Sequence, residues 1–236
     1  MINFLRWLFM IFWTAIMVTS SLILMVIFFN RKIPVIMART MWAPGMLWAS
    51  GIRLKIEGKD RFDRNSSYIF ASNHLSYLDI PVLFRAIPVN LYFIAKKEVK
   101  KIPFIGWYMM ATGMIFIDRK NRDKAIQSLE RAGNLIKGGK NVLVFPEGTR
   151  SKDGEVMALK KGSFMLAAQA DINVVPVAIH GTRSVLPPDT FKLKPGVVHV
   201  NIGAPVPPHN ETEKMEDFIG QVRTNLIGLK EELSQA

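Results

Sequence analysis

Asn73-His74-Leu75-Ser76-Tyr77-Leu78-Asp79 is the segment from which the organisation of the chain can be read. It follows a short apolar run, Tyr68 to Ala71, which is typical of a buried strand. On an ideal helix five residues turn about 500°, so the side chains of His74 and Asp79 would point about 140° apart. They can meet only if His74 lies in the loop after the strand and Asp79 lies in the first turn of a following helix. We therefore expect a strand, a loop and a helix here.

The pairing of His74 with Asp79 is a candidate catalytic dyad. In the expected loop the aspartate accepts a hydrogen bond from one imidazole nitrogen and leaves the other nitrogen free as a base. Histidine suits this task because its unperturbed pKa lies near neutrality. The structural alternative is a histidine that caps the helix, with an aspartate in the first turn that interacts with the helix dipole. The segment alone leaves both interpretations open.

The composition narrows the class of protein. A length of 236 residues suits one α/β domain with an appendage. The absence of cysteine excludes disulfides, thiolate metal sites and cysteine nucleophiles, and it leaves the redox compartment undetermined. A formal charge of +12 and a pI near 10.0 favour acidic partners. Nucleic acid is not expected among them, because the chain has no recognisable nucleic-acid-binding motif and opens with a long apolar segment.

The N-terminal segment 7–29 carries no charged residue. As a helix it would be about 35 Å long, enough for a hydrocarbon core of about 30 Å. It is too long for a signal peptide, and no small-residue cleavage site follows it. Arg31, Lys32 and Arg39 outnumber Arg6 on the other side, so the positive-inside rule places the rest of the chain in the cytoplasm. The expected location is the inner (cytoplasmic) membrane, with the catalytic part on its cytoplasmic face.

A second apolar stretch, 33–52, carries Arg39 and is interrupted by Pro34 and Pro44. It is too broken to predict a second span. It would either lie in the membrane interface as an amphipathic helix or fold back on the first segment as a hairpin. The alternative for both segments is a buried core helix. We expect residues 1–52 to form anchoring helices and residues 53–236 to form the α/β domain.

From residue 53 onward short apolar runs alternate with helical patterns, as in βα units. This alternation predicts an α/β fold. Strands are expected at 54–57, 68–71, 91–95, 114–117, 142–145, 174–179 and 197–202, and helices at 79–86, 103–112, 123–137 and 163–170. The chain is expected to end in a helix with one apolar face, formed by Met215, Phe218, Ile219, Val222, Leu226, Leu229 and Leu233. Asn210 and Glu213 are expected to form the capping box of the last helix.

Polar and charged residues gather at the ends of the expected strands, where open α/β sheets place their sites. Four blocks share this position: Asn73 to Asp79, Gly113-Met114-Ile115-Phe116-Ile117-Asp118-Arg119, Phe145-Pro146-Glu147-Gly148-Thr149-Arg150-Ser151 and Val175-Pro176-Val177. A proline cannot donate a ladder hydrogen bond, so the fourth block predicts an edge strand or a bulge.

Basic residues near these strand ends predict a phosphate receptor. Arg119 and Arg150 end two of the blocks, and Lys96, Lys160 and Lys161 lie nearby in the sequence. Arginine matches phosphate oxygens with two hydrogen bonds and keeps its charge. The alternative for each residue alone is a solvated surface charge.

Three other features of the blocks admit plain structural readings. Glu147 would pair with Arg150 and hold the turn, if it does not contact a ligand. Gly148 is expected for its backbone geometry. No metal is expected at His74 and Asp79, because no further cluster of ligand residues is apparent in the sequence.

Together the four blocks resemble those of the glycerolipid acyltransferases, and most closely the bacterial 1-acyl-sn-glycerol-3-phosphate (lysophosphatidic acid) acyltransferases. The match runs from about Arg53 to Ile202 with the blocks in the same order. The first and third blocks are specific, whereas the second and fourth are weak alone. The resemblance implies a mixed α/β sheet flanked by helices. It also implies an N-terminal membrane-embedded motif, which in bacterial relatives is a two-helix element held in one leaflet.

The resemblance also implies a reaction. His74 would take the proton of the sn-2 hydroxyl of 1-acyl-glycerol 3-phosphate as that oxygen attacks an acyl thioester, which gives phosphatidic acid for phospholipid synthesis. Asp79 would fix the tautomer of His74 and stabilise the imidazolium. No cofactor is implied beyond the co-substrate, which is acyl-CoA or the acyl carrier protein thioester. Direct transfer agrees with the absence of cysteine and of a G-x-S-x-G elbow.

The substrate-binding residues implied by the resemblance come from the second and third blocks and one lysine. They are Arg119, Glu147, Gly148, Thr149, Arg150 and Lys96. The arginines and the lysine would bind the glycerol phosphate, and Glu147 would accept a hydrogen bond from the acceptor or orient Arg150.

Two rival functions stay open. One is a sister acyltransferase that acts on glycerol 3-phosphate, another lysophospholipid or an acylated amino acid. The other is a non-catalytic membrane protein that binds lipid or scaffolds a complex, for which a degraded first block would be expected. Asn73, His74 and Asp79 are all present. The oligomeric state, the acyl chain length and the choice of thioester carrier are not encoded in these motifs.

Overall fold

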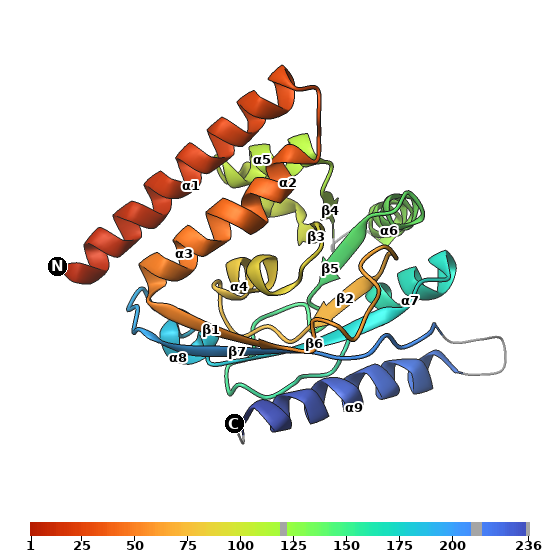
Figure 1. Cartoon of the computed structure of the whole chain (residues 1–236). Helices are drawn as coiled ribbons and strands as arrows, with labels where there is room; N and C mark the ends of the chain where they lie inside the picture. The colour runs from red at the N-terminus through yellow and green to blue at the C-terminus, as the bar shows by residue number, and fades with distance from the viewer. Residues whose placement is uncertain (119–121, 209–213, 235–236) are drawn as a thin grey trace.

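The computed structural model describes residues 1–118, 122–208 and 214–234 (Figure 1). The elements in chain order are α1 (Ile2–Ile27), α2 (Ile33–Met37), the π-helix η1 (Ala38–Trp42), α3 (Ala43–Ser50), β1 (Ile52–Glu57), β2 (Ile69–Ser72), α4 (Asp79–Ala86), β3 (Leu91–Lys96), the 3-10 helix η2 (Lys97–Lys101), α5 (Ile105–Thr112), β4 (Ile115–Ile117), α6 (Arg122–Lys137), β5 (Asn141–Val144), α7 (Lys161–Ala170), β6 (Val174–His180), α8 (Thr182–Val185), β7 (Gly196–Ile202) and α9 (Met215–Ser234).

The sheet has seven strands in the order β1-β7-β6-β2-β5-β3-β4. Neighbouring strands are parallel except for β6 and β7, which run antiparallel. The expected mixed α/β sheet is therefore confirmed. β2 lies between β6 and β5, so the loop that carries His74 leaves the sheet near its centre.

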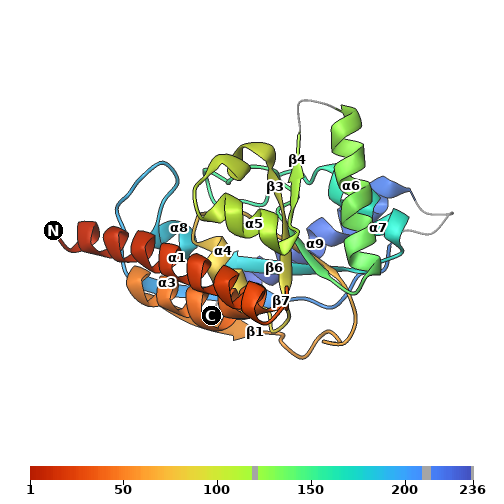
Figure 2. The same ribbon diagram turned by 90° about the horizontal axis from the view of Figure 1, so that it is seen from above.

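Helices cover both faces of the sheet (Figures 1 and 2). One face packs against α3 and α4, and the other packs against α6, α7 and α9. In β2 the side chain of Phe70 belongs to the first core, whereas Ile69 and Ala71 belong to the second. Successive side chains of a strand point to opposite faces, so a strand covered on both sides reads as a continuous apolar run.

Between residues 53 and 202 the expected strands and helices are found with ends that differ by about two residues or fewer, the usual uncertainty of such boundaries. The N-terminal helix begins at Ile2, five residues before the uncharged segment 7–29, and ends at Ile27. Two short elements, η2 and α8, were not expected. α9 buries Phe218, Val222 and Leu226 as its periodicity predicted. The predicted capping box of Asn210 and Glu213 lies outside the described residues.

The N-terminal helices form the hairpin that was one of the sequence alternatives. The helical run from α2 to α3 folds back along α1 (Figures 1 and 2). Trp13 Nε1 donates to the carbonyl of Trp42 at 3.2 Å, and Trp42 Nε1 donates to Thr14 Oγ1 at 3.1 Å. A Cβ on Gly45 would lie 2.3 Å from the Trp13 ring, so only glycine allows this approach. The division at residues 52 and 53 stays a prediction.

Two features of the hairpin follow from its prolines and its length. Pro34 and Pro44 each lie in a first helical turn, where proline is tolerated, and the π-helix η1 joins the two segments. Among the described residues α1 is long and apolar enough to cross a membrane by length and composition.

The prediction of an edge strand at Pro176 is wrong, because β6 lies inside the sheet between β7 and β2. The alternative, a bulge, is what the pairing shows. Val177 pairs with Ile202 and Val174 pairs with Val206, so the register shifts by one residue between the two pairs. The Pro176 carbonyl accepts a hydrogen bond from Gly203 N on the β7 side. The nitrogen of Pro176 lies on the same side of the strand as its carbonyl. Because the pairing with the β7 side is irregular there, the proline interrupts no regular ladder hydrogen bond.

Candidate active site

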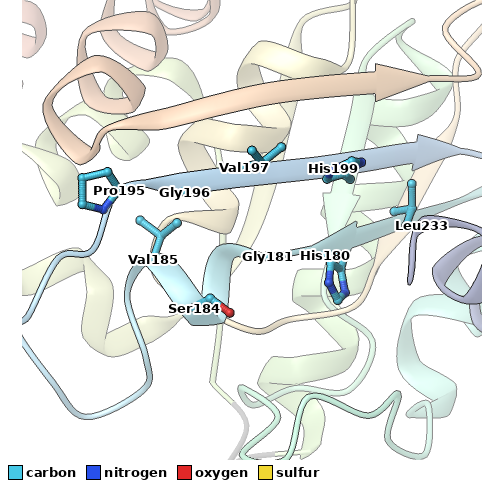
Figure 3. Close-up of a pocket in the computed structure, with 9 residues that line it drawn as sticks. All are labelled: His180, Gly181, Ser184, Val185, Pro195, Gly196, Val197, His199 and Leu233. Atoms are coloured by element: carbon cyan, nitrogen blue, oxygen red, sulfur yellow. The ribbon is translucent and has the colours of Figure 1, made fainter. Parts of the chain in front are cut away.

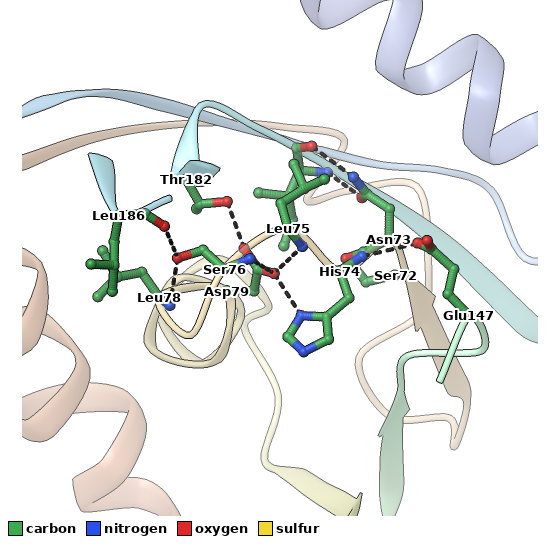
Figure 4. A network of polar contacts seen from close by, with 11 residues as sticks. Ser72, Asn73, His74, Leu75, Ser76, Leu78, Asp79, Glu147, Thr182 and Leu186 are labelled. Atoms are coloured by element: carbon green, nitrogen blue, oxygen red, sulfur yellow. Dashed lines mark hydrogen bonds and ion pairs between the residues drawn. The ribbon is translucent and has the colours of Figure 1, made fainter. Parts of the chain in front are cut away.

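The loop between β2 and α4 is held against the end of β6 by an asparagine. Asn73 Nδ2 donates to the carbonyl of Ile179 at 2.9 Å, and Ile179 N donates to Asn73 Oδ1 at 2.8 Å. Asn73 is fully buried, so these bonds replace those that it would make with water. The loop thus begins at a fixed point between two parallel strand ends (Figure 4).

His74 and Asp79 meet as their spacing allows. His74 lies in the loop, Asp79 begins α4, and Nδ1 of the imidazole is 2.8 Å from Asp79 Oδ2. A carboxylate only accepts, so Nδ1 carries the proton and Nε2 is left as the acceptor. The side chain of His74 is 17% exposed and that of Asp79 is fully buried, so the imidazole is the part of the pair that a substrate can reach. The ring edge opposite Nδ1 points away from the network in Figure 4.

The carboxylate of Asp79 is fixed by four donors. Besides the imidazole, Leu75 N and Ser76 N donate to Oδ2 at 2.6 and 2.8 Å. Thr182 Oγ1 donates to Oδ1 at 2.6 Å from the start of α8. The helix dipole alone would not require this many partners. The geometry therefore favours an orienting role for Asp79 over the simple capping alternative.

The ring and backbone of His74 are also restrained. Its imidazole stacks on Phe145, with ring centroids 4.0 Å apart and planes inclined by 17°. Its N–H donates to Glu147 Oε1 at 3.0 Å, and its carbonyl accepts from Ser151 N at 2.8 Å. Three residues of the segment after β5, namely Phe145, Glu147 and Ser151, thus fix the ring and the backbone of His74.

Glu147 has a different task from the predicted contact with the acceptor or with Arg150. Its two carboxylate oxygens accept from the backbone amides of His74 and Met157, at 3.0 and 3.3 Å, and the residue is 2% exposed. Burial raises the pKa of the Glu147 carboxyl, and the two amide donors and the nearby His74 oppose that shift. In this structure Glu147 is a positioning residue for the loop of His74.

Gly148 and Lys160 adjoin one another in the third block. Gly148 has a φ of 75°, which explains the glycine on backbone grounds as expected. A Cβ there would lie 2.7 Å from Lys160 Nζ, so the lysine side chain lies over the turn. Lys161 points elsewhere and pairs with Glu216 on α9. Thr149 is exposed beside this turn.

Arg150 lies over the loop of the dyad. Its guanidinium is 3.9 Å from the centroid of the Tyr77 ring, and Nη2 is 3.6 Å from Asp189 Oδ1. The Asp189 side chain is 77% exposed, so this ion pair is weak. Arg150 Nη1 is buried without a hydrogen-bond partner among the residues that the structure describes. A partly buried guanidinium with an unused donor is suited to an anionic ligand.

The remaining predicted basic residues stand at the β3–β4 edge. Lys96 ends β3, is exposed, and pairs in register with Ile117 of β4. The neighbouring Lys97 pairs with Asp118 at 2.8 Å. Arg119 lies outside the described residues. Within the described parts of the chain, no three His, Asp or Glu side chains gather as a metal site requires.

A cavity of about 330 Å³ lies elsewhere, between β6, β7 and α8 (Figure 3). It is lined by His180 and His199, which face each other in the β6–β7 register, and by Ser184. None of the predicted site residues lines it. Burial lowers the pKa of His180, and the nearby His199 and Lys230 reinforce this shift. None of the described residues that line this cavity has a carboxylate side chain, so the cavity lacks an oriented acid–base pair like that of His74 and Asp79.

A family model described as Acyltransferase matches residues 53–180. The chain belongs to the acyltransferase family. The matched range contains both members of the dyad and the whole third block. It ends just before Thr182.

Several named proteins are similar to this acyltransferase. A 1-acyl-sn-glycerol-3-phosphate acyltransferase of Saccharomyces cerevisiae is 36% identical over 78% of this chain and 61% of its own length. The chloroplastic enzyme LPAT1 of Arabidopsis thaliana is 36% identical over 68% of this chain and 47% of its own length. The chain thus spans about half to two thirds of these relatives. This chain also resembles the crystal structure of the 1-acyl-sn-glycerophosphate (LPA) acyltransferase PlsC from Thermotoga maritima, with a TM-score of 0.84 and 28% sequence identity. The superposition covers 99% of this chain and 97% of the PlsC chain.

Thr182 is the site residue that sequence reasoning missed. It lies more than a hundred positions from Asp79 and belongs to none of the four blocks. The available signal was its place, two residues beyond the end of β6, where the strand-end rule applies as it does after β2 and β5.

Replacing Thr182 with valine is expected to lower the turnover number of the acyltransferase roughly tenfold, with little change in KM. A hydrogen bond to a charged group contributes about 1.5–3 kcal/mol, and its loss frees the buried carboxylate to rotate away from the imidazole. Steady-state kinetics of Thr182→Val and Thr182→Ser check this, and the serine variant should restore most of the rate. Ser184→Ala, on the same helix, is the control. If Thr182→Val behaves like that control, Thr182 does not position Asp79.

Proposed function

We propose that the protein transfers a fatty acyl group from an acyl thioester to the sn-2 hydroxyl of 1-acyl-glycerol 3-phosphate, which yields phosphatidic acid. The observation that carries this proposal is the oriented pair of His74 and Asp79, at 2.8 Å, inside the range matched by the family model. The names of the relatives supply the acceptor. The donor carrier is acyl-CoA or acyl carrier protein.

In this reaction His74 acts as a general base. Its Nε2 takes the proton of the hydroxyl while the hydroxyl oxygen bonds to the thioester carbonyl carbon. The carbon–sulfur bond then breaks, and the imidazolium returns the proton to the leaving sulfur. Asp79 keeps Nε2 in the accepting form and stabilises the imidazolium. The acceptor hydroxyl attacks the thioester directly in this scheme, so no acyl-enzyme is required. The absence of cysteine and of a G-x-S-x-G elbow in the sequence supports direct transfer.

The phosphate of the acceptor is assigned to Arg150, with Lys96 and Arg119 as further partners. Support comes from the unused Nη1 donor of Arg150 and from its place over Tyr77, in the same loop as His74. Binding the phosphate there fixes the glycerol near the imidazole, and such positioning can supply more rate than the base alone.

The N-terminal hairpin is assigned to the membrane that holds the acceptor and the product. α1 is sufficiently long and apolar, and its side chains Phe4, Ile11 and Phe12 are exposed in the folded chain. Arg31, Lys32 and Arg39 follow it, so the proposed location is the inner membrane with the catalytic part on the cytoplasmic face.

Replacing Arg150 with alanine is expected to lower kcat/KM for lysophosphatidic acid by about 10- to 100-fold, mostly through a higher KM. The loss corresponds to one or more charge-assisted hydrogen bonds of about 1.5–3 kcal/mol. Arg150→Lys should recover only part of the affinity, because an ammonium cannot bind two phosphate oxygens in a fork. Kinetics with the acceptor and the thioester varied separately provide the measurement.

Arg64→Ala is the matched control for this variant, since Arg64 is exposed in the loop before β2, at the opposite end of that strand. It should leave both Michaelis constants unchanged. A rise in KM for the thioester alone after Arg150→Ala would contradict the phosphate assignment.

The test of the function is an acceptor panel. Purified protein would be offered an acyl-CoA, and in a second series an acyl carrier protein thioester, with lysophosphatidic acid, glycerol 3-phosphate, a lysophosphatidylcholine or an acylated amino acid, and free thiol would be measured. The chain has no cysteine, so the thiol reagent reports only released carrier. Thiol release that depends on lysophosphatidic acid supports the proposal. Release with another acceptor alone would identify a sister enzyme. Silence with every acceptor, for acyl-CoA and for acyl carrier protein thioester, would favour a non-catalytic lipid-binding protein.

A further inference from the structure

The segment formed by η2 and α5 exposes apolar side chains well outside α1. Ile102, Ile105, Trp107 and Met110 are all between 40% and 53% exposed. Four large apolar side chains within nine consecutive residues are unusual on a surface that faces only water. The same helix buries Met109 in the core, so it is packed in place and not loosely attached.

The turn that presents these side chains is tightly built. A Cβ on Gly106 would lie 2.3 Å from the Lys100 carbonyl oxygen, so η2 and the start of α5 approach at a distance that only glycine allows. Gly106 N donates to the Ile102 carbonyl at 2.8 Å. The ring centroids of Phe104 and Trp107 are 5.2 Å apart, so the two rings pack against each other. The exposed side chains are therefore displayed on a closed, hydrogen-bonded turn.

This surface adjoins the N-terminal hairpin. α5 packs against α1 and α2, and Figures 1 and 2 both show it beside the hairpin. Tyr108 Oη donates to the carbonyl of Pro34 in α2 at 3.2 Å. A bilayer that receives the exposed side chains of α1 would thus also meet α5.

The charges beside α5 fit an anionic bilayer surface. Lys100 and Lys101 of η2 are exposed next to Ile102, and the ion pairs of the described residues do not include them. Tryptophan favours the membrane–water interface, where its ring lies at headgroup level, and lysine binds anionic headgroups from there. An apolar protein partner would satisfy the side chains of α5 but not these ammonium groups.

We propose that η2 and α5 form a second bilayer contact, with Trp107 and Met110 inserted among the headgroups and Lys100 and Lys101 bound to anionic lipid phosphates. This inference rests on the proposed membrane-bound reaction and extends it. η2 follows β3 directly, so the contact holds Lys96 at the level where the anionic acceptor lies. The active site is thereby held at the bilayer surface from two sides.

The absence of cysteine allows a direct test with single cysteine variants that carry a fluorophore. Met110→Cys probes α5, Ile16→Cys probes α1, and Met165→Cys on α7 is the matched control. Met110 and Met165 are each 42% exposed, but α7 packs against α6 and α9 on the other face of the sheet. The proteins would be reconstituted in phosphatidylglycerol vesicles with and without a quencher carried on lipid headgroups or shallow acyl positions.

Strong quenching at positions 16 and 110 with none at 165 is the expected result. Quenching at 16 alone would overturn the second contact while leaving the anchor in place. Equal quenching at all three positions would also overturn it, because it would report general adsorption. Quenching at 110 that rises with protein concentration in vesicles without lipid quencher would point to a second copy of the chain as the occupant, and would overturn it as well.

The role of the lysines has its own readout. Lys100→Gln with Lys101→Gln should reduce quenching at position 110 in phosphatidylglycerol vesicles and leave quenching at position 16 unchanged. Each lysine is expected to change the partition of the segment about fivefold, and added salt should mimic the substitutions. If quenching at position 110 is unchanged both in the double variant and in added salt, the charge assignment is contradicted. Thiol release measured on the same vesicles separates the outcomes, since a silent enzyme that is quenched at 110 contradicts the proposed function and not the contact.

Discussion

Replacing His74 with alanine is expected to reduce acyl transfer by about 10² to 10⁴-fold, the usual contribution of a positioned general base. The loss should appear in kcat, because the proposed phosphate and thioester contacts do not involve the imidazole. The backbone bonds of residue 74 to Glu147 and Ser151 do not depend on its side chain, so the loop is expected to stay folded. The variant loses the stacking on Phe145, at a cost of about 0.5–1.5 kcal/mol, and the hydrogen bond from Nδ1 to Asp79. Asp79 keeps its other three donors, Leu75 N, Ser76 N and Thr182 Oγ1.

Thiol release by the variant, together with its recovery in the membrane fraction and its melting temperature, provides the measurement. His180→Ala is the control, because His180 also lies at the carboxyl end of a strand but lines the separate cavity of Figure 3. It should retain most of the activity. A His74→Ala protein that keeps substantial turnover would exclude His74 as the base.

Replacing Asp79 with asparagine is expected to be nearly as damaging to turnover, about 10²-fold or more, with little effect on folding. The amide oxygen can still accept from the imidazole and the Leu75 and Ser76 amides, and the amide nitrogen can donate to the Thr182 hydroxyl. The network keeps its shape, but no negative charge remains to stabilise the imidazolium. Kinetics and thermal melting of the same preparation separate the two effects.

Asp79→Ala should differ from the asparagine variant in stability. It leaves buried donors without an acceptor, at about 1–3 kcal/mol for each. Asp171→Asn is the control, because Asp171 lies in the left-handed region at the end of α7, which asparagine also tolerates. If Asp79→Asn turns over normally, then the aspartate serves the helix and not the histidine.

The local features of the site could be predicted from the sequence because they depend on neighbouring residues. The five-residue spacing of His74 and Asp79 allows one arrangement in which they meet, and the structure has it. Gly148 lies in a left-handed turn as its position indicated. The strands and helices follow apolar periodicities that span only a few residues, so their ends could be placed closely.

The long-range partners could not be predicted in this way. Thr182 reaches Asp79, and Asn73 binds Ile179, only because β6 lies next to β2 in the sheet. Nothing in the local pattern states which strands become neighbours. The same limit explains why the role of Glu147 was not predicted. Its buried carboxylate accepts a hydrogen bond from the backbone of the loop after β2, and it does not pair with Arg150 three residues away.

The sequence by itself determined the elements, the apolar N-terminal helix and the acid–base pair, since each is encoded within one turn or one strand. The tertiary structure alone decided that Pro176 lies inside the sheet, that the run from α2 to α3 folds back on α1, and that α5 lies beside this hairpin. These outcomes depend on the order of the strands and on packing between segments far apart in the chain. Such contacts form where surfaces fit and bury apolar area, and a pattern read along one segment does not contain the surface of another.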